Sequence, residues 1–278
     1  MDTVSRQVDD PTATWSYSEL WNKFPIPARP DSEELVIEGE SIKNCGKLGA
    51  DIELMILGST IEYRSLANKL SITPHVVDFS KQNFDILSSY SQEVFDHEQF
   101  IESDWLQIEY KNKFDFILGH RPFNVVRHDQ IDTLFTKMYE ALLPGGTFFC
   151  RGNVLFADSY IDIEAIREKW AFVSNRPYPL FSYLEVALYI QCSDDMGYLD
   201  YPKAQAIVDT WFQEEKITEQ DYKQVRPLIS LPAGTKFRSS VKKEELENCI
   251  TKVGFASVEW LFTSHEFTKN MPILKLTK

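Results

Sequence analysis

The stretch DIELMILGSTIEYRSLANK, residues 51–69, decides the fold of this chain. Residues 54–57 form an apolar run short enough to be a buried strand. Gly58, Ser59 and Thr60 supply the small residues of a tight turn, and the apolar residues after them recur at roughly helical spacing. A strand, a small-residue turn and a helix form the first unit of a doubly wound α/β domain, in which ligands bind at the carboxyl ends of the strands. The alternative is an ordinary strand–helix connection that binds nothing.

Four further segments continue this alternation. Strands are predicted over residues 74–80, 98–105 and 114–120, and a fifth begins at 147–150. A helix over residues 129–143 precedes the fifth strand and ends at Pro144-Gly145-Gly146. Five strands with intervening helices in about 100 residues predict a parallel sheet.

The hydrophobic content and the net charge indicate a globular protein and limit its expected partners. The chain has 278 residues, of which 43% are hydrophobic, and a formal net charge of −13. A core of ample size is expected, whereas so acidic a surface repels phosphate backbones and disfavours a nucleic-acid partner.

The four cysteines are scattered and form no CxxC pair, which argues against a zinc site and against a disulfide framework. No metal site is therefore predicted. The N-terminus lacks the pattern of a signal peptide, and no apolar run approaches the length that spans a bilayer. We expect a cytoplasmic protein without a membrane partner.

Two segments do not follow the alternation of strands and helices. Residues 1–47 predict an N-terminal helical cover, in which a second helix begins after Asp31. Residues 153–235 are rich in tyrosine and predict three or four helices, which we interpret as a lid that builds a substrate pocket; a purely structural insertion is the alternative. The remaining residues, 48–152 and 236–278, form the predicted core, which closes with a helix ending at Gly254 and an antiparallel hairpin.

Five stretches carry a resemblance to a known family. They are ELMILGST (53–60), VVDFS (76–80), FIESDW (100–105), FDFILGH (114–120) and LLPGGTFF (142–149). In this order and spacing the chain resembles the class I S-adenosylmethionine-dependent methyltransferases. The resemblance implies a Rossmann-like, doubly wound α/β fold with a seven-stranded, mostly parallel sheet whose last strand is antiparallel. The helical lid between residues 153 and 235 lies outside the resemblance.

The resemblance also implies a site for S-adenosyl-L-methionine. The residues that it places around the cofactor are Gly58, Ser59 and Thr60 at the methionine and ribose, Asp78 at the ribose hydroxyls, Phe79 and Ser80 beside the adenine, Asp104 and Trp105 around the adenine, and Gly119 and His120 at the sulfonium end. Asp78 follows Gly58 by 20 residues, close to the spacing expected of a ribose-binding acid. Its alternative role is to cap the helix that follows.

Two positions depart from the family. The first loop keeps only Gly58 of the usual glycines, so that the hydroxyl of a neighbouring residue would bond the cofactor in place of a close backbone approach. His120 stands where many relatives have an acid or an asparagine; it is a candidate catalytic base, a cofactor contact or a neutral replacement. A base is needed only if the methyl acceptor is protonated, because methyl transfer depends mainly on alignment and on exclusion of water.

The sequence is compatible with three functions. The first is a methyltransferase for a small-molecule or peptide acceptor; aromatic and acidic lid residues would suit a cationic or amine-bearing acceptor. The second is a catalytically inactive, methyltransferase-like protein-binding subunit. The third, a nicotinamide-dependent oxidoreductase, lacks the G-x-G-x-x-G turn that its pyrophosphate requires. The sequence favours the first.

Overall fold

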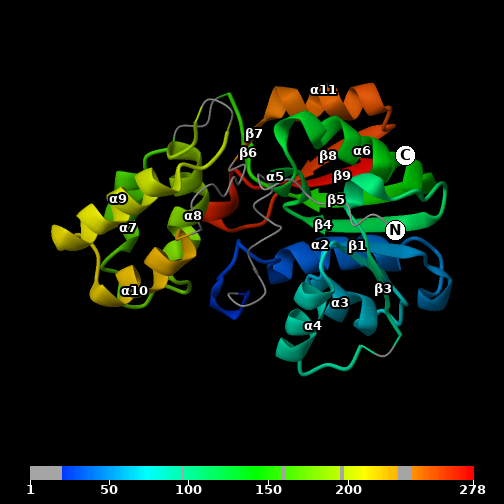
Figure 1. Cartoon of the computed structure of the whole chain (residues 1–278), viewed down its shortest axis with the longest axis horizontal. Coiled ribbons are helices and arrows are strands. Elements are labelled where there is room, and N and C mark those ends of the chain that lie inside the picture. The colour runs from blue at the N-terminus through cyan, green and yellow to red at the C-terminus, as the bar shows by residue number, and fades with distance from the viewer. Residues whose placement is uncertain (1–20, 96, 158–160, 195–196, 231–239) are drawn as a thin grey trace.

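A seven-stranded sheet forms the centre of the molecule (Figure 1). The computed structural model describes residues 21–95, 97–157, 161–194, 197–230 and 240–278. The strands are β1 (Leu54–Leu57), β2 (His75–Asp78), β3 (Gln99–Glu102), β4 (Phe114–His120), β5 (Leu142–Arg151), β8 (Ser257–Leu261) and β9 (Ile273–Thr277). Their order is β3-β2-β1-β4-β5-β9-β8; β1 to β5 pair in parallel, and β9 is antiparallel to both neighbours. The predicted seven-stranded, doubly wound sheet is therefore confirmed.

Helices cover both faces of the sheet (Figure 1). On one face lie α2 (Ser32–Lys43), α3 (Ile61–Lys69) and α4 (Lys81–Tyr90). On the other lie α6 (Ile131–Ala141) and α11 (Lys243–Val253). All four residues of β1 are buried, as expected of a strand with helices above and below it.

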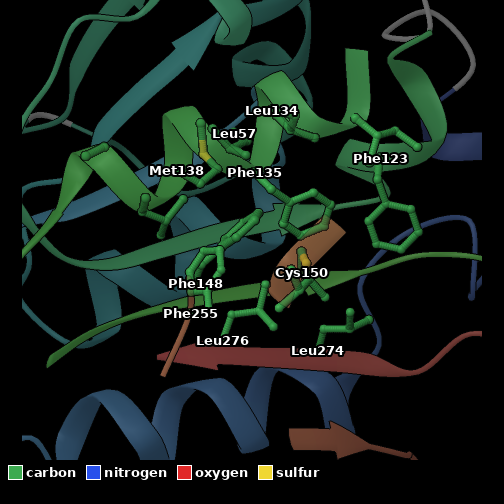
Figure 2. Packing of buried hydrophobic residues seen from close by; sticks show 14 of the residues in the cluster. Leu57, Phe123, Leu134, Phe135, Met138, Phe148, Cys150, Phe255, Leu274 and Leu276 are labelled. Carbon is green, nitrogen blue, oxygen red and sulfur yellow. The ribbon is translucent and has the colours of Figure 1, made fainter. Parts of the chain in front are cut away.

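The core beneath α6 is built mainly from aromatic and long aliphatic side chains. Figure 2 shows Phe135 and Met138 of α6 over Phe148 of β5, with Leu276 of β9 close by. These four side chains are fully buried. The helix predicted over residues 129–143 thus packs its apolar side chains on the sheet.

A four-helix insertion separates β5 from α11. It contains α7 (Ile163–Trp170), α8 (Leu180–Gln191), α9 (Tyr201–Gln213) and α10 (Glu219–Leu228), and it gathers beside the sheet rather than over a face of it (Figure 1). The insertion has its own hydrophobic core, at the centre of which α8 is buried on every side. Two short strands, β6 (Val154–Leu155) and β7 (Val241–Lys242), pair in parallel where the insertion leaves and rejoins the core.

Shorter elements complete the chain. They are α5 (Pro122–Val125) and five 3-10 turns, η1 (Trp21–Lys23), η2 (Gly49–Asp51), η3 (Trp105–Gln107), η4 (His128–Gln130) and η5 (Glu266–Thr268). The predicted helix start after Asp31 is confirmed, because the Asp31 side chain accepts the Glu34 backbone N–H at the start of α2. No helix in the described part of the chain is long and apolar enough to cross a bilayer.

Four predicted boundaries differ from the structure. The third strand, predicted over residues 98–105, is Gln99–Glu102, and Trp105 begins a 3-10 turn. The helix predicted over residues 129–143 ends at Ala141, and β5 already begins at Leu142 and runs through the Pro-Gly-Gly segment, with an irregular register against β4. The second strand ends at Asp78, because Ser80 caps α4. The first helix of the predicted N-terminal cover, which precedes the one after Asp31, falls mostly on residues outside the described ranges, and the described residues Trp21–Lys23 form a 3-10 turn.

Candidate functional site

A pocket opens at the carboxyl ends of β1, β2 and β4. The space between its walls amounts to about 1070 Å³, open solvent included. Its lining residues come from the sheet (Leu57, Gly58, Ser59, Thr60, Asp78, Phe79, Trp105, His120, Arg121), from α4 and α5 (Asn83, Leu87, Val125), from the N-terminal segment (Trp21, Phe24, Ala28) and from the insertion (Glu185, Tyr189, Tyr201, Leu228). Three parts of the sequence therefore meet at one cavity, and the helical insertion supplies one of its walls.

Asp78 is the carboxylate at the sheet side of this pocket. Its side chain is buried, and its Oδ2 accepts both the backbone N–H of Ser59, at 2.9 Å, and the Ser59 hydroxyl, at 2.7 Å. Oδ1 accepts the backbone N–H of Ser80 at 3.1 Å. Burial raises the pKa of Asp78 above its ordinary value of 3.8, and the bonds from Ser59 and Ser80 oppose that rise. The loop after β1 is thus tied to the end of β2.

Trp105 lies against the same loop. Its indole N–H donates to the Val77 carbonyl at 2.8 Å, and the backbone N–H of Gly58 donates to that carbonyl at 2.8 Å. Gly58 has φ of 81°, a conformation that glycine adopts without the strain of a side chain. A Cβ added at Gly58 would lie 3.5 Å from the Trp105 ring. The indole and the glycine turn therefore form one surface.

Seven of the ten predicted site residues line the pocket, and three do not. Ser80 caps α4 with its hydroxyl and donates its N–H to Asp78. The Asp104 side chain accepts the Leu106 N–H at the start of η3, the turn that carries Trp105. A Cβ at Gly119 would lie 3.1 Å from the Pro122 ring, so Gly119 permits the close packing of α5. Ser80, Asp104 and Gly119 therefore support residues of the pocket wall without lining the pocket themselves.

His120 has both ring nitrogens engaged. Nδ1 lies 3.1 Å from Glu34 Oε1, and Nε2 lies 3.0 Å from the Pro27 carbonyl oxygen. The Pro27 carbonyl oxygen can only accept, so Nε2 donates to it, and Nδ1 faces the Glu34 carboxylate. A general base needs an unprotonated nitrogen directed at its substrate. In this geometry His120 instead holds the N-terminal segment over the strand ends, through its contacts with Glu34 and Pro27.

The charges around His120 form a buried network. Arg151 Nη1 donates to Glu34 Oε2 at 2.7 Å and to Asp31 Oδ2 at 2.6 Å, and all three side chains are buried. Burial works to raise the pKa of Glu34, but the positive charges of His120 and Arg151 outweigh it and lower that pKa to about 2. In the same way the two carboxylates raise the pKa of Arg151 against the effect of burial. Glu34 is therefore ionised beneath the pocket.

Arg121, which follows β4, joins the sheet to the insertion. Its φ of 58° and ψ of 32° place it in the left-handed region, which is uncommon for a residue with a side chain. Nη1 donates to Glu185 Oε1 of α8 at 2.7 Å, and Nη2 donates to the Pro27 carbonyl at 3.1 Å. One side chain thus contacts all three parts of the pocket wall. Sequence reasoning missed both Arg121 and Glu185, although a single acid in the apolar stretch LFSYLEVALYI was a usable signal.

The pocket is suited to a nucleoside carrying a short polar tail. The Asp78 carboxylate accepts the Ser59 hydroxyl and the backbone N–H groups of Ser59 and Ser80, with a further hydrogen bond from the Phe79 backbone, and ribose hydroxyls would bond it by replacing the Ser59 hydroxyl. Phe79, Leu87 and Trp105 give the adjoining wall the apolar character that a purine ring requires. The residues present therefore fit S-adenosylmethionine. Among the described residues, no group of three or more His, Cys, Asp and Glu side chains is arranged to hold a metal ion.

Comparison with known proteins finds similarity in structure only. No family model and no curated protein matches the sequence. A structure from Rhodobacter sphaeroides, provisionally assigned to the Zn-dependent alcohol dehydrogenases, is 14% identical with a TM-score of 0.54, over 95% of this chain and 98% of that one. The CMeT domain of the citrinin polyketide synthase is 8% identical with a TM-score of 0.50, over 87% of this chain and 50% of that one.

A Mesorhizobium loti structure described as an S-adenosylmethionine-dependent methyltransferase is 13% identical with a TM-score of 0.49, over 88% of this chain and all of that one. At these identities the likeness concerns the fold alone. The topology is more specific, because an antiparallel β9 lies between β5 and β8 at one end of a sheet that is otherwise parallel. This is the arrangement that the five sequence stretches imply. The chain has the fold of the class I S-adenosylmethionine-dependent methyltransferases.

Proposed function

We propose that this protein is an S-adenosylmethionine-dependent methyltransferase that acts on a small-molecule or peptide acceptor. The observation that carries the proposal is Asp78, a buried carboxylate at the end of β2, tied to the first loop and exposed to a pocket that the insertion completes. An inactive scaffold would gain nothing from keeping a desolvated carboxylate at this position, because its burial is costly.

In this proposal the sheet side of the pocket holds the cofactor. Asp78 accepts the ribose hydroxyls, the Gly58–Thr60 turn lies along the ribose and the methionine, and Phe79 and Trp105 contact the adenine. Ser80, Asp104 and Gly119 act indirectly, by fixing Asp78, Trp105 and α5. His120 keeps the N-terminal segment closed over the strand ends.

The bound cofactor supplies an electrophilic methyl group on a sulfonium. The protein's own work is to align the acceptor with that carbon and to keep water out. Trp21, Phe24 and Tyr189 from the N-terminal segment and α8 provide an apolar wall for this purpose.

Calorimetric titration with S-adenosylhomocysteine and S-adenosylmethionine tests the proposal. We expect a dissociation constant in the micromolar range for the wild-type protein and a loss of at least tenfold in the Asp78→Ala variant, about 1.4 kcal/mol or more. Asp85→Ala, which removes an exposed carboxylate from α4, is the matched control and should bind normally. Absence of heat and of thermal stabilisation with both ligands would overturn the enzyme function and favour the protein-binding alternative.

A further inference from the structure

Glu185 is a buried carboxylate that the fold does not fully satisfy. It lies on α8, where most of the other side chains are apolar and no other is charged, and it is 1% exposed. Oε1 accepts Arg121 Nη1 at 2.7 Å. Oε2 is shielded from solvent and has no hydrogen-bond partner among the residues that the structure describes.

A buried carboxylate oxygen without a hydrogen-bond donor lowers the stability of the folded protein, because it has lost its bonds to water and gained none in return. Native proteins therefore seldom keep such an oxygen without a use. Glu185 lies in the wall of the pocket described above. A molecule in that pocket can therefore supply the donor that the protein lacks.

The residues around Glu185 indicate the chemical class of that molecule. On the insertion side its neighbours in the pocket wall are Tyr189, Tyr201 and Leu228, and the N-terminal segment adds Trp21 and Phe24. Such a wall suits an aromatic or otherwise apolar body. Arg121 already balances the charge of Glu185, so a neutral donor completes the hydrogen bonding without adding a buried charge.

We propose that Glu185 recognises the methyl acceptor, and that the acceptor is an aromatic small molecule that donates one neutral O–H or N–H to Glu185 Oε2. The inference rests on the proposed function, because it assigns the insertion side of the same pocket to the acceptor. Arg121 is the positioning residue, because its bond to Oε1 fixes the Glu185 carboxylate and leaves Oε2 as the oxygen available to the ligand's donor.

The test uses three small probes that share a 4-propylphenyl body, measured by calorimetry on the full-length protein with and without saturating S-adenosylhomocysteine. They are 4-propylphenol, 4-propylaniline and 4-propylanisole; the last lacks a donor. We expect the phenol or the aniline to bind at least tenfold more tightly than the anisole, because a site built around an acceptor rejects a ligand that cannot donate.

Glu185→Gln is the decisive variant. The amide oxygen keeps the bond to Arg121, while its NH₂ group replaces the acceptor Oε2 by a donor. The preference for the phenol or aniline over the anisole should then fall below twofold, since the anisole oxygen can accept. Glu168→Gln, an exposed position on α7 outside the pocket, is the matched control and should keep the wild-type preference.

Equal binding of the three probes, binding of none, or an unchanged preference in Glu185→Gln would overturn the proposal. Each of these would show that an ordered water or the protein itself satisfies Oε2. Failure of the proposed function is a separate result, because it is scored by S-adenosylhomocysteine binding and by Asp78→Ala, whereas the preference among the probes is measured without cofactor as well.

Discussion

Asp78 is subject to two opposing effects on its ionisation. Burial raises its pKa, and donors from Ser59 and Ser80 lower it. The sequence predicted the acid, because its distance from Gly58 is a short-range property of a strand–helix–strand unit. It did not predict that the Ser59 N–H and hydroxyl both donate to Oδ2, since that depends on how two loops meet in space.

Replacing Ser59 by alanine removes one of the donors that favour the ionised carboxylate. The pKa of Asp78 should rise further above 3.8. A protonated Asp78 accepts ribose hydroxyls poorly, so affinity for S-adenosylhomocysteine should decline on acidification, and in Ser59→Ala the decline should begin at a higher pH than in the wild type. Calorimetric titration across a pH series measures this shift.

Ser89→Ala, on the exposed side of α4, provides the comparison and should follow the wild-type profile. If Ser59→Ala binds with the wild-type pH profile, the Ser59 hydroxyl does not control the ionisation of Asp78, and its bond to Oδ2 is incidental.

At the scale of elements, strands were the most predictable feature. Apolar runs such as residues 54–57 and 114–120 need only local pattern to be recognised, and β1 and β4 match them residue for residue. α2 is different. Its start at Asp31 follows from a local cap, but no local pattern indicated that Glu34 and Glu38, one turn apart, would be buried. The partners of Glu34, His120 and Arg151, and the partner of Glu38, Tyr63, lie far along the chain, out of reach of any local pattern.

Glu38 gives α2 a pH-dependent stability. Burial, reinforced by the nearby charge of Glu34, raises the pKa of Glu38 well above 4.5. A raised pKa in the folded state means that stability is fully present below 4.5 and is lost as pH rises toward the folded pKa, because the unfolded chain ionises first. Relative to Glu38→Gln, the wild type should therefore lose about 1.4 kcal/mol of unfolding free energy per pH unit in that window.

Urea denaturation of the wild type and Glu38→Gln at pH 5 and pH 7 measures this loss. Glutamine keeps an acceptor for the Tyr63 hydroxyl, which donates to Glu38 Oε1 at 3.3 Å, so the hydrogen bond does not confound the comparison. Glu40→Gln, an exposed position on the same helix, should show no such pH dependence. A constant difference between the wild type and Glu38→Gln would mean that Glu38 ionises normally.

The whole molecule contains separate hydrophobic cores. Two clusters lie on opposite faces of the sheet, and a third fills the insertion around α8. Helical periodicity predicted the helices of the insertion, and the single acid in an apolar stretch marked Glu185, but no local pattern indicated where α8 would lie relative to the sheet. That placement depends on Arg121, which bonds to Glu185 and to the Pro27 carbonyl at once. In our proposals the cofactor contacts belong to the sheet and the acceptor contacts to the insertion.

If the cofactor binds at the sheet and the acceptor at the insertion, a cavity in the insertion core should weaken acceptor binding more than cofactor binding. Leu184 is fully buried at the centre of α8, and Leu184→Ala should cost about 2–5 kcal/mol of stability through the cavity it leaves. Affinity for S-adenosylhomocysteine should change less than threefold, since its contacts come from the strand ends. Affinity for 4-propylphenol should fall at least tenfold, because α8 carries Glu185 and Tyr189.

The control is Phe212→Ala, a truncation at the surface of the neighbouring helix α9, which should leave both affinities unchanged. Measurement at a temperature where circular dichroism shows each variant fully folded excludes global unfolding as the cause. Equal losses of both ligands in Leu184→Ala would contradict the division and would show that the sheet and the insertion respond as one unit. A selective loss of the phenol would locate acceptor recognition on α8, because only the insertion's packing has been altered.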